Sequence, residues 1–69
     1  VNHALLSATV IASSGIRADA LATACMVLGE EGALEMIEKT EDASCHLIIA
    51  NGDATRITVS SRWLEDVTE

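Results

Sequence analysis

The turn Asn51-Gly52, followed by Asp53, constrains this chain more than any other feature of its sequence. It stands between two runs rich in apolar and β-branched residues, 45–50 (CHLIIA) and 55–60 (TRITVS). Asn-Gly tolerates the positive φ angles of a type I′ turn, and between two such runs it is the strongest short-range signal of a β-hairpin. The sequence therefore predicts two antiparallel strands that are neighbours in one sheet and that turn at Asn51-Gly52.

A third strand and a helix are predicted before the hairpin. Residues 5–12 (LLSATVIA) are apolar and β-branched and end at Ser13-Ser14-Gly15, which suits a strand of about eight residues buried on both faces. Apolar residues then recur at helical spacing from Ala18 to Leu28. The helix is rich in alanine, which lets neighbouring backbones approach closely, so we expect it to lie deep in the structure. Gly29 is expected to end it.

A second helix is predicted over residues 30–39, where Ala33, Leu34 and Ile37 form an apolar stripe opposite a solvated acidic face. The predicted order is strand, helix, helix, strand, strand. This order indicates an α+β fold with one sheet covered on one face by helices. A chain of 69 residues buries only about 60% of its unfolded surface, so it is one small domain at most and its size favours a partner.

Charge and hydropathy exclude several classes of partner. Four Lys and Arg residues against eleven Asp and Glu residues give a net charge of −7, so the basic surface that nucleic acid requires is missing. The apolar runs are far shorter than the ~20 residues of a membrane span, so we expect no membrane contact from this segment.

Cys25 and Cys45 are too far apart for a CxxC site. We expect two buried apolar side chains there, and a disulfide between them stays open.

Asp19 and Thr23 are the side chains most suited to carry chemistry. They are four residues apart, which places both on one face of the predicted helix, one turn from each other. A carboxylate and a hydroxyl are oxygen ligands of the kind that Mg²⁺ prefers. Two structural alternatives stay open: an Asp in the first turn complements the helix dipole, and a Thr often bonds the backbone carbonyl four residues earlier.

The remaining polar candidates are interpreted as structural. His3 and His46 lie in or beside different predicted strands with no Asp, Glu or Cys at ligand spacing, so we expect partly buried structural groups. Trp63 is expected to cover the exposed edge of the sheet, and a binding role for it stays open. Arg17 is expected either to approach a phosphate at the helix N-terminus or to remain in solvent. No catalytic residue is predicted.

The run LLSATVIA at 5–12, followed by DALAT at 19–23 and VLG at 27–29, resembles the ApbE family, whose members are FAD:protein FMN transferases. The resemblance continues through 32–39 and the hairpin to Ser60-Ser61, so it covers nearly the whole chain. It implies that residues 1–69 are the C-terminal portion of an ApbE-like flavin transferase domain. It also implies that Asp19 and Thr23 help to hold Mg²⁺ beside the FAD pyrophosphate, while FMN is attached to a Thr of an acceptor protein.

The resemblance also implies that most of the active site lies outside these residues. In the family, further flavin and metal contacts precede the region matched by Val1, so we expect the isolated chain to be inactive and no FAD-binding residue within it. The implied partners are FAD, an acceptor protein, and either the N-terminal half or another copy of the chain; the implied location is the periplasm or cell envelope. Two alternatives stay open. One is a stand-alone interaction module whose alanine-rich helix and Val1-end strand pair with a copy of the same chain or with a separate N-terminal half, and the other is a degenerate remnant that keeps the fold without the chemistry.

Overall fold

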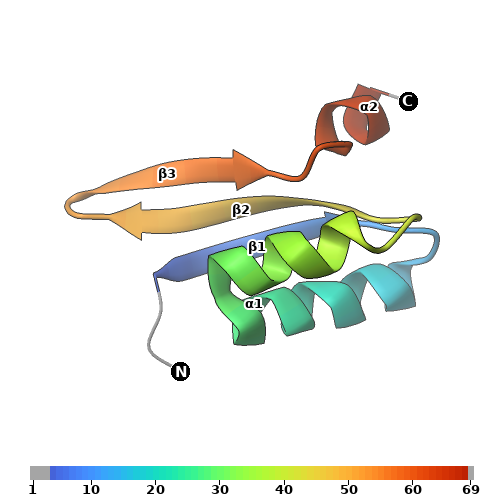
Figure 1. The fold of residues 1–69 in the computed structure, drawn as a ribbon, viewed down its shortest axis with the longest axis horizontal. Coiled ribbons are helices and arrows are strands. Elements are labelled where there is room, and N and C mark those ends of the chain that lie inside the picture. The colour runs from blue at the N-terminus through green and yellow to red at the C-terminus, as the bar shows by residue number, and fades with distance from the viewer. Residues whose placement is uncertain (1–3, 69) are drawn as a thin grey trace.

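The computed structural model describes residues 4–68 and has an α+β fold, as predicted. Its three strands form one antiparallel sheet in the order β1-β2-β3, and α1 packs on one face of that sheet (Figure 1). The elements are, in chain order, β1 (Leu5–Ile11), α1 (Gly15–Glu38), β2 (Ser44–Asn51), β3 (Ala54–Val59) and α2 (Trp63–Thr68).

The predicted hairpin is confirmed, with its turn one residue further on than expected. Strands β2 and β3 pair antiparallel from His46 with Val59 to Asn51 with Ala54, which leaves Gly52 and Asp53 as the two turn residues. Gly52 has a φ of 66°, and no described residue other than glycine has a positive φ. A positive φ at the first turn residue alone is the pattern of a type II′ turn, so the type I′ turn at Asn51-Gly52 is wrong.

The predicted order differs from the structure, because residues 15–38 are joined in one element, α1, and a helix that was not predicted, α2, follows the hairpin. Helix α1 is nevertheless broken at the glycine that the sequence indicated. Gly29 has φ 80° and ψ −179°, a backbone conformation that is essentially restricted to glycine. The chain reverses there (Figure 1), which divides α1 into a first half, residues 15–28, and a second half, residues 30–38.

Helix α2 was not predicted, because six residues are too few to show a helical period. It begins at Trp63, whose ring lies 5.3 Å from the ring of His46, centroid to centroid. His46 is on β2, the middle strand, and its side chain lies on the face opposite α1. Trp63 therefore packs on the middle of the sheet instead of covering its edge. The prediction that helices cover one face holds for α1 alone, because α2 lies on the opposite face.

The core lies between α1 and the sheet. Its buried apolar residues are Leu5, Cys25, Ala33, Ile37, Ala43, Cys45, Leu47 and Ile49. Cys25 and Cys45 are free thiols and fully buried, which confirms them as core side chains. Burial raises the pKa of the Cys25 thiol to about 11, with a smaller contribution from Cys45, and both thiols therefore stay neutral at physiological pH.

Candidate functional site

Asp19 and Thr23 lie on the exposed side of the first half of α1, one turn apart, as their spacing predicts. The Thr23 hydroxyl donates a hydrogen bond of 3.1 Å to the backbone carbonyl of Asp19, so the structural alternative for Thr23 is present. That bond uses the hydroxyl proton, and the lone pairs of the Oγ1 atom, which a metal would require, remain available. Within residues 4–68, no side chain is found bonded to the Asp19 carboxylate.

The helix-dipole alternative for Asp19 does not fit the position at which α1 begins. The helix starts at Gly15, and its first turn contains no acidic residue, so the expectation that Asp19 lies in that turn is wrong. The N-terminus is capped by Ser14, whose hydroxyl oxygen accepts a bond of 3.1 Å from the backbone N–H of Arg17. The dipole effect falls off within the first turn, so its interaction with the Asp19 carboxylate contributes little to stability.

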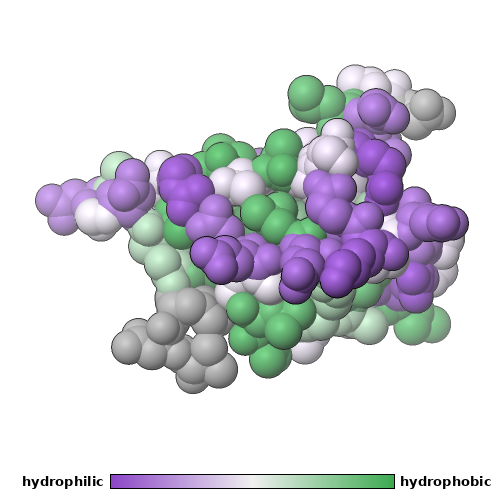
Figure 2. Space-filling model, in the orientation of Figure 1, coloured by the Kyte–Doolittle hydropathy of each residue, from purple (hydrophilic) through white to green (hydrophobic). Residues whose placement is uncertain are grey.

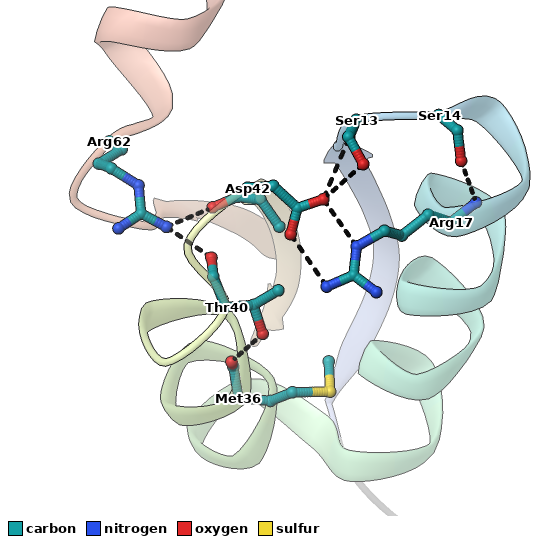
Figure 3. A network of polar contacts seen from close by, with 8 residues as sticks. Ser13, Ser14, Arg17, Met36, Thr40, Asp42 and Arg62 are labelled. Carbon is teal, nitrogen blue, oxygen red and sulfur yellow. Dashed lines mark hydrogen bonds and ion pairs between the residues drawn. The ribbon is translucent and has the colours of Figure 1, made fainter.

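Arg17 binds Asp42 (Figure 3), so the expectation that it remains in solvent without a partner is wrong. Its Nε atom lies 2.6 Å from one carboxylate oxygen of Asp42 and its Nη2 atom 2.9 Å from the other. Ser13 adds bonds from its hydroxyl at 2.7 Å and its backbone N–H at 3.3 Å. Arg17 and then Ser13 hold the pKa of Asp42 well below its usual range.

The turn at residues 40–43 is fixed from its other side as well. The Nη2 atom of Arg62 donates to the carbonyl oxygens of Thr40 and Ala43, each at 2.7 Å (Figure 3). The sequence did not single out Asp42 or Arg62, because their partners are about twenty residues or more away along the chain and no local pattern links them. Together these contacts join the start of α1, the turn before β2 and the start of α2.

Two acidic residues of the second half of α1 are engaged in the same way. Glu30 receives bonds of 2.8 and 2.7 Å from Arg56 of β3. Glu38 accepts two bonds of 2.7 Å from the backbone and hydroxyl of Ser61. Arg56 lowers the pKa of Glu30, and Ser61 lowers the pKa of Glu38. These carboxylates therefore stabilise the fold and are not available to a ligand, in contrast to Asp19.

The described part of the chain does not contain a complete metal site. No group of three or more His, Cys, Asp and Glu side chains is placed to hold a metal ion, and residues 4–68 form no pocket. Mg²⁺ takes about six oxygen ligands, of which Asp19 and Thr23 supply at most two from protein side chains. The two oxygens are of the right chemical kind and lie on one open face, so they fit part of such a site.

The ApbE family model matches residues 1–47, which include Asp19, Thr23 and the Gly29 break. This chain belongs to the ApbE family. It is 41% identical to the FAD:protein FMN transferase of Haemophilus influenzae over 69 residues, which are 100% of this chain and 19% of that protein. It is 36% identical to the FAD:protein FMN transferase of Escherichia coli K12 over 63 residues, 91% of this chain and 18% of that protein.

The ApbE chain thus spans about a fifth of the length of the curated relatives that it matches. No solved structure matches it. In the described residues, neither helix combines the length and the apolar character that crossing a membrane requires.

His3 lies outside the described residues, and His46 is half-buried against Trp63.

Proposed function

We propose that this chain is part of a Mg²⁺-dependent FAD:protein FMN transferase, to which it contributes Asp19 and Thr23 as metal ligands. The reaction class is supported by the relatives from two bacteria, both named FAD:protein FMN transferase. The metal role rests on one observation: the exposed carboxylate of Asp19 lies one helical turn from the exposed hydroxyl of Thr23 on the first half of α1.

The surroundings of Asp19 favour a cation. The nearest basic residue in sequence, Arg17, is neutralised by Asp42, so its charge does not compete for the Asp19 carboxylate. The bond from Thr23 to the Asp19 carbonyl fixes the hydroxyl with its lone pairs open to solvent. When bound, Mg²⁺ would stabilise the negative charge that develops on the FAD pyrophosphate while the acceptor hydroxyl is joined to FMN and AMP leaves.

The isolated chain is expected to be inactive. Its two candidate ligands leave most of the oxygen shell of Mg²⁺ to other parts of a full-length protein, and residues 4–68 offer no pocket for a flavin. The remaining ligands, the flavin contacts and the contacts to an acceptor Thr belong in this proposal to the N-terminal part of the protein. The family resemblance also supports a periplasmic or cell-envelope location.

The interaction-module alternative has lost part of the surface on which it depended, whereas β1 remains an edge strand of the sheet. The alanine-rich first half of α1 packs its Cys25 side into the chain's own sheet, where Cys25 is fully buried. That side of the helix is not available to a second chain. The degenerate-remnant alternative predicts the same fold. Only a measurement of FMN transfer distinguishes it from the proposed function.

The test uses the full-length protein that carries this chain. AMP release and flavin attachment to the acceptor are measured across a Mg²⁺ titration for the wild type, Asp19→Ala, Thr23→Val and the control Glu31→Ala, which removes another exposed acid of α1. We expect Asp19→Ala to abolish transfer and Thr23→Val to weaken it less, because water can replace a neutral hydroxyl but not a charge. Glu31→Ala should resemble the wild type, and circular dichroism checks folding.

Two results would count against the proposal. Wild-type rates for Asp19→Ala at limiting Mg²⁺ would remove the metal assignment. A folded wild-type protein that transfers no FMN at any Mg²⁺ concentration would favour the remnant.

A further inference from the structure

In the strands that the structure describes, the face of the sheet that points away from α1 carries no Asp, Glu, Lys or Arg side chain. Strand register places on this open face the residues Ser7, Thr9 and Ile11 of β1, Ser44, His46, Ile48 and Ala50 of β2, and Thr55, Ile57 and Val59 of β3. None of them is Asp, Glu, Lys or Arg, although the chain contains fifteen such residues, eleven acidic and four basic. By contrast, Figure 2 shows a band of hydrophilic residues across the side on which α1 lies.

Strand β3 is patterned for burial of the open face. Its polar residues Arg56 and Thr58 point to the α1 side, where Arg56 binds Glu30. Thr55 and the apolar residues Ile57 and Val59 point away, and Ile57 and Val59 are 61% and 38% exposed. An antiparallel sheet with one solvated face shows the reverse arrangement, apolar residues toward its helix and polar residues toward water.

Strand β2 gives the same indication. The run Leu47-Ile48-Ile49 is apolar on both faces, which is typical of a strand that is covered on both sides. Leu47 and Ile49 are buried under α1, and Ile48 lies on the open face between Ser7 and Ile57. Within residues 4–68, the element placed on this face is α2, through the contact of Trp63 with His46.

We propose that the open face is the surface on which the rest of a full-length ApbE polypeptide docks. This inference rests on the proposed function, in which the chain is a portion of a larger transferase. The relatives indicate the occupant: the chain aligns with 19% and 18% of their lengths, so about four-fifths of each is further polypeptide. A sheet face that carries apolar side chains and no charge is buried by another layer of the same domain in the common layered architectures. The apolar residues Ile48, Ile57 and Val59 on this face indicate that the docked layer contacts it through uncharged side chains.

The test measures how well the open face is shielded from solvent in the full-length protein. A cysteine is placed on this face by Ile57→Cys and, as a matched control, on the solvated second half of α1 by Glu35→Cys, at a side chain that is 73% exposed. Both variants are reacted with a maleimide, and modification at each position is followed by peptide mass spectrometry. We expect the Ile57→Cys thiol to react at least about tenfold more slowly than the Glu35→Cys thiol, at every protein concentration.

Equal rates at the two positions would overturn the proposal. Protection that disappears on dilution would also overturn it, because a second copy would then cover the face. Hydroxyl-radical footprinting of the unsubstituted protein gives the same answer without a variant: Ile57 and Val59 should be protected relative to the urea-unfolded protein, and full oxidation of both would contradict docking. Because burial is measured independently of FMN transfer, a shielded face in an inactive protein would count against the proposed function alone.

Discussion

Two acidic side chains in the second half of α1 are bound by donors of the chain itself, whereas Asp19 in the first half is not. In the second half, Glu30 and Glu38 accept short hydrogen bonds from Arg56 and Ser61, and Ala33 and Ile37 are fully buried. In the first half, Asp19 is exposed on the outer side of the helix beside Thr23. A carboxylate that accepts hydrogen bonds from its own chain therefore stabilises the fold, whereas a carboxylate exposed to solvent is available to a ligand.

The largest effect expected from this comparison is on the packing of the second half. Ile37→Ala removes a side chain that has no exposed surface and should cost about 2–5 kcal/mol of unfolding free energy. Val27→Ala in the first half, at a residue that is 60% exposed, should change it by no more than about 0.5 kcal/mol. Urea denaturation followed by circular dichroism measures both. Similar losses for the two variants would show that the halves do not differ in packing.

The next effect concerns the break between the halves. Gly29→Ala places a β-carbon at φ 80° and ψ −179° and should destabilise the fold by about 1–3 kcal/mol. Gly15→Ala is the matched control, because an added β-carbon there meets nothing within 4 Å and no positive φ is required. That variant should be neutral or slightly stabilising. A Gly29→Ala protein as stable as Gly15→Ala would mean that α1 does not require the break.

A smaller effect follows from the engaged carboxylates. Because the pKa values of Glu30 and Glu38 are lowered in the fold, their contribution is present above the unfolded value of about 4.3 and is lost as the pH falls through the folded value. Glu30→Gln should therefore reduce the loss of stability between neutral pH and roughly pH 3. Thermal melts at several pH values measure this, and the effect should shrink in high salt because the pair is partly exposed. An unchanged pH dependence would exclude a stabilising role for the pair.

Features encoded by neighbouring residues were predictable from the sequence. The β2–β3 hairpin, the break at Gly29 and the shared face of Asp19 and Thr23 follow from turn chemistry and helical spacing. The Arg17–Asp42 pair was not predictable, because its members are 25 residues apart and only the tertiary fold brings them together. Helix α2 was missed for a related reason, since its position depends on the contact between Trp63 and His46.

The smallest effect on stability is expected at the candidate site itself. Asp19→Ala should change the unfolding free energy by no more than about 0.5 kcal/mol, because the side chain is exposed and lies beyond the first turn of α1. Asp42→Ala is the contrasting variant, since it removes the acceptor for Arg17 and Ser13, and it should lower the melting temperature more than Asp19→Ala does. Equal melting temperatures for the two variants would remove the distinction between engaged and available carboxylates.

The most direct test of the account is to locate the bound cation in the full-length protein. Fe²⁺ is substituted for Mg²⁺ in the presence of FAD, and ascorbate with peroxide then generates radicals that cleave the backbone next to the metal; mass spectrometry maps the cuts. We expect cleavage in the first half of α1 around residues 19–23. Excess Mg²⁺ should suppress this cleavage, and Asp19→Ala should abolish it. Cleavage confined to other segments, or unchanged by Asp19→Ala, would contradict the assignment of Asp19 and Thr23 as metal ligands.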